Sequence, residues 1–333
     1  MKILAPARSA MEVEMLVHHG AEELYCGLTP PEWHERFGGL TWLNRRSPLG
    51  GNLQSYEELG EMVRRARIPV FLTLNGQGFT PEQLDFQIEI ARRAQQLGVA
   101  AFIVADLALL LRLRQQLPDM PLHLSSLASC FNRASIDFFT HLGVERVVLP
   151  RQVTLDEIEA LRKACPKVEI EVFILNDGCF YDEGVCATTH SLKPFCMTPW
   201  QETWERRGQP LDAADAARVA THQKELQKVL WANNNCGCSP SPKGLPQGPC
   251  GLCALPRLAA MGVDSLKIVG REASGLRKLA SLQLVRAVVE RVRAGQSEDE
   301  VQQFAVQVRE TPDLCASGRM CYYREVRWRP SLV

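Results

Sequence analysis

Short apolar runs alternate with amphipathic segments along most of the chain. Apolar runs of roughly four to eight residues between turn residues are typical of buried strands, whereas apolar positions recurring every three or four residues indicate helices. Alternation of the two predicts βα units and therefore a parallel sheet. The eight expected strands cover residues 2–7, 23–28, 70–75, 101–106, 122–126, 146–150, 168–175 and 264–269.

Eight βα units favour closure of the sheet into a (β/α)8 TIM-like barrel. An open doubly wound sheet is the alternative, but no glycine-rich dinucleotide fingerprint follows the first expected strand. The alternation stops after the seventh strand, where a cysteine-rich insertion precedes the eighth. We expect residues 1–333 to form a single barrel domain, with 179–253 inserted in it and a C-terminal helix and tail over 295–333. Residues 29–52 are expected to be a long loop that carries binding residues.

Polar residues at the ends of the expected strands are candidates for a functional site. In a (β/α)8 barrel the active site lies at the C-terminal ends of the strands. Four residues there are our candidate catalytic residues: Asn75, Asp106, Arg151 and Arg271. The same rim is expected to hold Tyr25, Cys26, Ser125, Ser126, Asn176 and Glu272.

The composition is ordinary for a soluble globular protein, with 46% hydrophobic and 23% charged residues. The 38 basic and 38 acidic residues balance, which argues against bulk nucleic-acid binding but is compatible with a local basic patch. We see no signal peptide and no apolar stretch long enough to span a membrane, so a cytoplasmic protein is expected. Twelve cysteines in a reducing compartment indicate metal binding or catalysis rather than disulfides.

The cysteines gather in and around the expected insertion. Cys179, Cys186 and Cys196 are widely spaced, and Cys250 and Cys253 form one CxxC pair. Thiolates suit zinc or iron–sulfur clusters, and zinc sites usually show two close pairs. The irregular spacing therefore favours a 4Fe–4S cluster over zinc or free thiols. Of the other cysteines, Cys236 and Cys238 are either alternatives for the fourth ligand or bystanders in a loop, and Cys130 and Cys165 are expected to be structural. Cys26 is either catalytic or a buried small hydrophobe. Cys315 and Cys321, with Tyr322 and Tyr323, either fold the tail back over the site or form a tail pair without a redox role, and we favour the second.

The segment around the first two cysteines resembles the signature of the collagenase-like peptidase family, U32. The matching residues are Glu171, Phe173, Cys179, Gly184 and Cys186. The turn Asn-Asp-Gly before the first cysteine departs from the family's small-residue turn, and Ala-Thr follows the second where an aliphatic residue and Ser are usual. The stretches LAPA…GAEELYCGL, VVLPR and GVDSLKIVGR are also similar to the family, so the resemblance spans almost the whole barrel.

The resemblance implies a 4Fe–4S protein that supports oxygen-independent hydroxylation, although family members are often labelled peptidases. Substrates in the family include ubiquinone precursors, tRNA uridine and a ribosomal RNA cytidine, and prephenate is implicated as the oxygen source. The resemblance further implies that Cys179, Cys186 and Cys196 are cluster ligands, and we expect Cys253, or else Cys250, as the fourth. It also implies a hetero-oligomer with a related family member, as in the pairs that act on ubiquinone precursors.

The choice between hydrolase and hydroxylase depends on which chemistry the residues can support. No HExxH or GxSxG motif supports a peptidase, and His123 with Ser125 on one strand face is a weak candidate. For a hydroxylase, Arg151, Lys267 and Arg271 are expected to clamp the carboxylates of an anionic donor such as prephenate. Neutral charge and short length favour a small molecule or quinone precursor over RNA as substrate. A U32-type peptidase, an RNA-hydroxylation factor and a non-catalytic cluster-bearing partner subunit are the alternatives.

Overall fold

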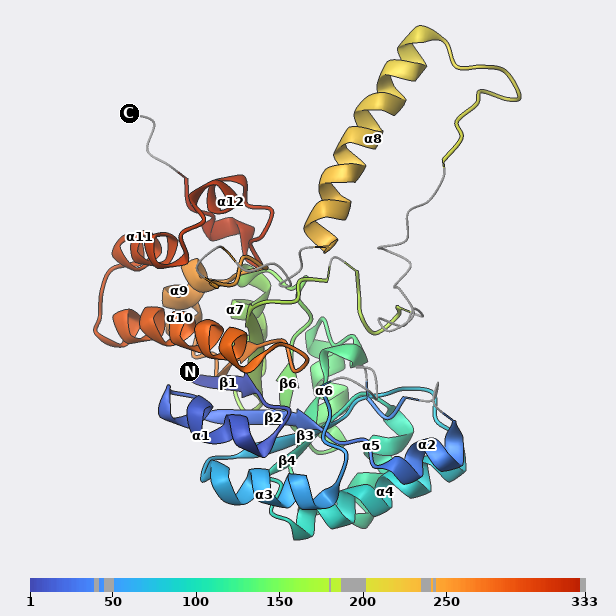
Figure 1. The fold of residues 1–333 in the computed structure, drawn as a ribbon, viewed down its shortest axis with the longest axis vertical. Helices are drawn as coiled ribbons and strands as arrows, with labels where there is room; N and C mark the ends of the chain where they lie inside the picture. Colours follow the sequence, from blue (N-terminus) through green and yellow to red (C-terminus); the bar gives the residue numbers. More distant parts are fainter. Residues whose placement is uncertain are drawn as a thin grey trace.

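Eight parallel strands form a closed barrel in the computed structural model of the chain (Figure 1). Each strand pairs with the next, and the last returns to pair with the first. The expected (β/α)8 architecture is therefore confirmed. The strands are β1 (Lys2–Pro6), β2 (Glu23–Gly27), β3 (Val70–Leu74), β4 (Ala101–Val104), β5 (Leu122–Leu124), β6 (Val144–Val148), β7 (Glu169–Leu175) and β8 (Ser265–Ile268). The structure describes residues 1–38, 42–44, 51–179, 181–186, 202–234, 241 and 244–329.

Helices surround the barrel, and the last four stack together beyond β8 and β1 (Figure 1). Short 3₁₀ turns follow β5, precede α9 and occur in the tail. No helix in the described part is long and apolar enough to cross a membrane. The helices are α1 (Ala10–His18), α2 (Pro31–Phe37), α3 (Tyr56–Ala66), α4 (Pro81–Gln96), α5 (Leu107–Gln116), α6 (Arg133–His141), α7 (Leu155–Ala164), α8 (Ala213–Asn234), α9 (Leu255–Ala260), α10 (Gly275–Arg293), α11 (Glu298–Arg309) and α12 (Pro312–Ser317), with 3₁₀ turns η1 (Ser126–Ala128), η4 (Leu252–Ala254) and η5 (Arg324–Val326).

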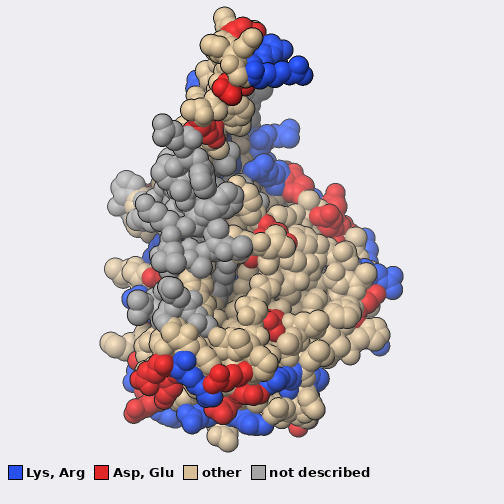
Figure 2. Space-filling model, turned by 90° about the vertical axis from the view of Figure 1, so that its right-hand side faces the viewer, with Lys and Arg blue, Asp and Glu red and all other residues tan. Residues whose placement is uncertain are grey.

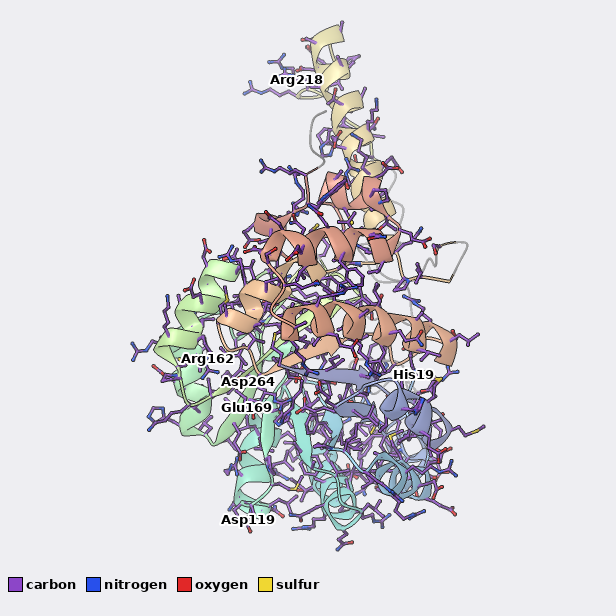
Figure 3. The ribbon with its side chains drawn as sticks, turned by 90° about the vertical axis from the view of Figure 1, so that its left-hand side faces the viewer. His19, Asp119, Arg162, Glu169, Arg218 and Asp264 are labelled. Carbon is purple, nitrogen blue, oxygen red and sulfur yellow. The ribbon has the colours of Figure 1, made fainter. Side chains whose placement is uncertain are left out.

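The insertion lies between β7 and β8, as the sequence predicts. Its α8 projects away from the barrel (Figure 1) and carries Arg218 at a distance from the other labelled side chains (Figure 3). The chain then returns through η4 and α9, which pack against α11 and α10. The end of the insertion is therefore part of the folded body, whereas α8 is mostly exposed to solvent.

The expectation of one long loop over 29–52 is wrong, because α2 forms within this segment. Proline occupies the first turn of this helix, where its missing N–H costs nothing. Trp33 is fully buried, and its ring centroid lies 4.7 Å from that of Phe37 and 5.8 Å from that of Phe86. Aromatic packing against α4 thus stabilises a helix that is too short and too rich in proline for its periodicity to reveal it.

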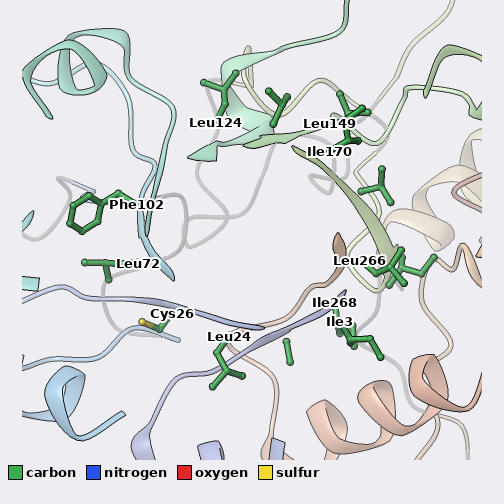
Figure 4. Close-up of a cluster of buried hydrophobic side chains, with 14 of the residues drawn as sticks. Ile3, Leu24, Cys26, Leu72, Phe102, Leu124, Leu149, Ile170, Leu266 and Ile268 are labelled. Atoms are coloured by element: carbon green, nitrogen blue, oxygen red, sulfur yellow. The ribbon is translucent and has the colours of Figure 1, made fainter. Parts of the chain in front are cut away.

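Alternate residues of each strand point outward into the main hydrophobic core. Leu24, Cys26, Leu72 and Phe102 belong to this layer (Figure 4), and all four are fully buried. This layer seals the strands against the surrounding helices. It also explains why the strands appear in the sequence as nearly continuous apolar runs.

The opposite faces of the strands fill the barrel with charged side chains. Arg146 donates to Glu23 at 2.8 Å and to Glu171 at 3.2 Å, and Lys267 donates to Glu171 at 2.6 Å. All four residues are less than a tenth exposed. Burial alone would raise the pKa of Glu23, but Arg146 lowers it overall. The barrel interior is therefore a network of mutually neutralised charges.

Aromatic rings line the same interior and contact the two buried cations. The Arg146 guanidinium lies 5.1 Å from the Phe71 ring centroid, and the Lys267 ammonium lies 4.3 Å from that of Tyr25. Cations over aromatic faces are stabilised electrostatically. Burial, opposed by Glu171, lowers the pKa of Lys267.

Ionic contacts stabilise the N-terminal end of β7, at the opposite end of the barrel from the predicted site. The Asp264 carboxylate accepts from the Ile170 amide at 2.8 Å and from Arg162 at 3.0 Å. Arg162, Asp264 and Glu169 lie together in Figure 3. Contacts at this end of a (β/α)8 barrel contribute to stability rather than to catalysis.

Replacement of Arg146 by alanine should lower the free energy of unfolding by roughly 3–5 kcal/mol, because buried Glu23 loses its main partner and buried Glu171 loses one of its two. Equilibrium unfolding in urea measures the change. The matched control is Arg133→Ala, which breaks an exposed pair with Asp137 at 3.2 Å and should cost about 0–1 kcal/mol. Equal effects of the two substitutions would contradict a stabilising role for the interior network.

Candidate functional site

The chain leaves β7 through a tight turn that sets the direction of the cysteine loop. Asn176 and Asp177 have φ values of 68° and 46°, in the left-handed region that Asn and Asp tolerate better than most residues. Asn176 is buried, and its amide donates to Ser281 Oγ at 3.0 Å. The turn brings Cys179 to the C-terminal end of the barrel.

The stretch between Cys179 and Cys186 is docked on the segment after β5. The Asp182 carboxylate accepts hydrogen bonds from Ser129 Oγ at 2.8 Å and from the Gly184 amide at 2.9 Å. A Cβ on Gly184 would lie 2.2 Å from Ser129 Oγ, so the close approach requires glycine. The two thiols therefore lie at the ends of a short loop that side chains of the barrel hold in place.

Arg151 connects this loop to the end of β6. Its guanidinium pairs with the Glu183 carboxylate and lies 3.7 Å from the Phe173 ring centroid. Burial alone would lower the pKa of Arg151, but Glu183 and then Tyr322 raise it overall. Arg151 is thus at the rim as predicted, and part of its charge is used to hold the cysteine loop.

Cys179 lines a cavity of about 400 Å³ at this end of the barrel. Guanidinium groups bind carboxylates and phosphates well, and the cavity has arginines from two directions. One follows β6 and the other two belong to the C-terminal tail. With three arginines against one carboxylate among the described residues, that of Glu325, the cavity has a lining of net positive charge that suits a small anion. Its lining includes Arg151, Cys179, Arg319, Cys321, Tyr322 and Arg324.

The structure groups Cys250 and Cys253 with tail cysteines. A second, narrow cavity is lined by Cys250, Cys253, Cys315 and Cys321 together with Arg309. Cys179 lines only the larger of the two cavities. The predicted fourth ligand, Cys253, therefore has other thiols as its neighbours within the described part of the chain.

Three cysteines of the prediction, Cys196, Cys236 and Cys238, lie outside the described residues. In the described ranges, no group of three or more His, Cys, Asp or Glu side chains is arranged to hold a metal ion. The role of Cys179 and Cys186 as cluster ligands stays a prediction. Both are half-buried, and their loop is fixed in place.

Asn75 and Asp106 lie on the predicted rim, where the structure gives each a hydrogen-bonding role. Asn75 donates to Ser125 Oγ at 3.2 Å. The Asp106 carboxylate caps α5 by accepting from the Leu109 amide at 3.0 Å, and its other oxygen accepts from the Gly78 amide at 3.0 Å. A catalytic role for either residue stays a prediction.

Arg271 is buried in a cradle of polar side chains at the end of β8. Its guanidinium donates to Thr73 Oγ1 at 2.7 Å, to Asn52 Oδ1 at 3.1 Å and to Asn44 Oδ1 at 3.2 Å. A Cβ on Gly27 would lie 2.2 Å from Arg271 Nη1. Three acceptors therefore fix the orientation of the predicted rim arginine, and a glycine in β2 makes room for it.

The expectation that Lys267 joins the two arginines in an anion clamp is wrong. Lys267 lies on an interior position of β8 and is bound to Glu171 inside the barrel. Alternation along the strand directs it inward. The side chains that share the cavity with Arg151 come instead from the tail.

Two weaker candidates prove to be packing residues. His123 is buried against the Phe71 ring, and burial lowers its pKa well below the usual range. Within the described residues, Ser125 accepts from Asn75 and has no hydrogen bond to His123. Cys26 is fully buried, and burial raises its pKa to about 12, which favours the small-hydrophobe interpretation (Figure 4).

The structure favours the alternative in which the tail folds back over the site, and sequence reasoning missed the two tail arginines, Arg319 and Arg324. Tyr322 donates to the Asn176 carbonyl oxygen, and Tyr323 donates to the Phe173 carbonyl oxygen at 3.2 Å. Arg319 and Arg324 thereby reach the cavity. The dense mixture of Arg, Tyr and Cys over 319–328 was the available signal.

Replacement of Gly27 by alanine should lower the free energy of unfolding by about 1–3 kcal/mol, because the added methyl group overpacks the Arg271 cradle. Urea unfolding measures this loss. Gly275→Ala is the control, since a Cβ there would meet nothing closer than 3.8 Å. An unchanged stability of the Gly27 variant would contradict the tight packing of Arg271.

Several known proteins are similar to the chain. The tRNA hydroxylation protein P of Escherichia coli is 25% identical over 330 residues, which cover 90% of this chain and 70% of that protein. The tRNA hydroxylation protein P of Helicobacter pylori is 27% identical over 188 residues, but the match covers only 42% of its length. An uncharacterized protease of Methanocaldococcus jannaschii is 24% identical over 319 residues, covering 91% of this chain and 69% of that protein.

One solved structure is similar to part of the chain. The U32 peptidase Mk0906 matches with a TM-score of 0.41 and 16% identity, covering 52% of this chain and 68% of that one. Residues 8–329 match the sequence model of peptidase family U32. The match covers nearly the whole chain, so this protein belongs to peptidase family U32.

Proposed function

We propose that this chain is an iron–sulfur protein that supports oxygen-independent hydroxylation. The observation that carries the proposal is the fixed loop with Cys179 and Cys186 at its ends, beside an arginine-lined cavity at the C-terminal end of the barrel. Active sites of (β/α)8 barrels lie at this end. The names of its relatives, which include tRNA hydroxylation proteins, support hydroxylation over proteolysis.

The proposed 4Fe–4S cluster is held by Cys179, Cys186 and Cys196. Thiolates are the usual ligands of such clusters, and two half-buried thiols on a rigid loop suit that donor set. Cys253, or else Cys250, is the expected fourth ligand, but both line a cavity with Cys315 and Cys321 that Cys179 does not line. We therefore propose Cys236 or Cys238 for the fourth position. When bound, a cluster of this type supplies electron transfer or Lewis-acid chemistry.

The cavity beside Cys179 is proposed to bind a small carboxylate, such as prephenate, as the oxygen donor. Arg151 is already paired with Glu183, so Arg319 and Arg324 contribute the main positive charge. Among the described residues, Arg319 forms an ion pair with one carboxylate, that of Glu225, at a distance of 4.0 Å. Guanidinium groups so placed would orient a carboxylate in two-point contacts.

A small aromatic molecule, such as a quinone precursor, is the first candidate substrate. Among the described residues on the face in Figure 2, acidic and basic side chains are intermingled and form no continuous basic track of the kind that nucleic-acid binding favours. RNA is the second candidate, favoured by the names of the tRNA hydroxylation proteins and of a 23S rRNA 5-hydroxycytidine synthase of Escherichia coli, 27% identical over 191 residues. In either case we propose a related family member as the partner subunit.

Replacement of Cys186 by serine should remove the iron and sulfide of one 4Fe–4S cluster, about four iron atoms per chain, and its visible absorbance from anaerobically purified protein, because the cluster loses a thiolate ligand. Cys165→Ser is the control, since Cys165 lies at the end of α7. Iron content equal to that of the unmodified protein in the Cys186 variant would contradict the proposed ligand. A colourless wild-type protein would contradict the cluster itself.

Deletion of the gene in its host should abolish one hydroxylated product under anaerobic growth, and the wild-type chain but not Cys186→Ser should restore it. Mass spectrometry of quinone precursors and of tRNA and rRNA nucleosides identifies which product is lost. Loss of a hydroxylated nucleoside would replace the first candidate substrate with the second. Formation of product by the purified chain alone would exclude a purely non-catalytic partner role.

A further inference from the structure

Four cysteines that are distant in sequence line one narrow, enclosed cavity between the insertion and the tail. Cys250 and Cys253 come from the end of the insertion, and Cys315 and Cys321 come from α12 and the segment after it. The spacings are CxxC and Cx5C. Two close thiol pairs from separate segments are typical of thiolate metal sites.

The backbone aligns the two segments. The Cys250 amide donates to the Met320 carbonyl oxygen at 2.7 Å, and the Tyr322 amide donates to the Cys250 carbonyl oxygen at 3.0 Å. Cys250 and Cys321 are thus direct partners in a short parallel bridge. A Cβ on Gly251 would lie 2.9 Å from the Tyr323 ring, so the strand and the tail pack too closely for a larger residue there.

The thiols also lie within electrostatic reach of one another. Burial raises the pKa of Cys253, and Cys250, Cys315 and Cys321 each raise it further. Burial likewise raises the pKa of Cys321 to about 12, with contributions from Cys250 and Cys315. The four thiols therefore line one cavity, whereas Cys179 lines the neighbouring one.

A buried cation beside the thiols lacks a negative partner. Arg309 is 2% exposed and donates to the carbonyl oxygens of Gln247 and Gly248. Its Nε has no hydrogen-bond partner, and no carboxylate in the described residues pairs with it. A buried charge is costly unless an opposite charge compensates it. Neutral thiols do not compensate it, whereas metal-bound thiolates would.

We propose that Cys250, Cys253, Cys315 and Cys321 form a second metal centre, separate from the Cys179 loop, which binds a thiophilic metal and fastens the tail to the barrel. A zinc ion and an iron–sulfur cluster share this ligand chemistry. The thiols do not yet surround a common point at bonding distance, so binding would draw the tail and the insertion together. Cys321 lines both cavities, and the centre would therefore also fix the wall that carries Arg319 and Tyr322.

Metal analysis of four proteins tests the proposal. The wild type, Cys186→Ser, Cys315→Ser and Cys165→Ser are purified anaerobically, and zinc, iron and sulfide are measured per chain. Cys315→Ser should lose about one zinc ion or about four iron atoms that the Cys186 variant retains, and the Cys165 control should lose neither. Zinc loss identifies a mononuclear site, and loss of iron with sulfide identifies a second cluster.

Two results would overturn the proposal. One is an unchanged metal content in Cys315→Ser, which leaves the four residues as thiols. The other is loss in that variant of the same iron that Cys186→Ser loses, which assigns the thiols to the first centre. Because the two variants are read separately, failure of the cluster proposed at Cys186 would not be mistaken for failure of the second centre.

Thiol labelling of the wild-type protein covers the case in which Cys315→Ser does not fold. Cys315 and Cys321 should resist alkylation in the purified protein and become at least tenfold more reactive after chelator treatment, as mass spectrometry of the peptides would show. Cys130, buried elsewhere, should not change. Equal labelling of Cys315 and Cys321 before and after chelation would contradict the proposal.

Discussion

The backbone of residues 249–251 is held between β7 and the tail, and the architecture of the site depends on this double pairing. On one side the Asn176 amide donates to the Pro249 carbonyl oxygen at 2.8 Å, and the Gly251 amide donates to the Ile174 carbonyl oxygen at 2.8 Å. On the other side Cys250 pairs with the tail. Backbone groups buried at such a junction must be paired, so the insertion has to return to the strand that it left.

This pairing has consequences for the cavity beside the cysteine loop. It places Pro249 against Gly178, where a Cβ would lie only 2.3 Å from the proline ring. It also brings Tyr322, Arg319 and Arg324 to the mouth of the barrel. A cavity lined by cysteine and arginine is thus assembled from four parts of the chain: the end of β6, the loop after β7, Pro249 at the end of the insertion, and the tail. The barrel supplies a rigid frame, and the insertion and tail supply most of the chemistry.

The signature residues of the family can now be understood physically. Glu171 neutralises two cations inside the barrel, and Phe173 lies under the Arg151 guanidinium. Gly184 permits the close approach of the cysteine loop to Ser129. Phe173, through Arg151 and Glu183, and Gly184 therefore support the loop that ends in Cys179 and Cys186, whereas Glu171 stabilises the barrel interior. Packing and charge neutralisation account for these positions before any cofactor chemistry is considered.

Much of the fold was predictable because the barrel depends on local patterns. Short apolar runs and helical segments with a period near 3.6 residues identify the eight βα units, and every strand lies within two residues of its expected bounds. The rim location of Arg151 and Arg271 followed from their place just after strands. The inward direction of Lys267 could also be derived from alternation, but its pairing with Glu171 required knowledge of which strands are neighbours across the closed barrel.

The sequence by itself determined the barrel, the position of the insertion and the family, because these depend on periodicity and on short motifs. Only the tertiary structure decided which cysteines are neighbours. Cys253 and Cys321 are separated by 68 residues (321 − 253), yet they line one cavity, and nothing in their local sequence indicates this. The physical reason is that cysteine proximity arises from long-range backbone pairing between the insertion and the tail, whereas strand and helix formation depends on residues close together in the chain.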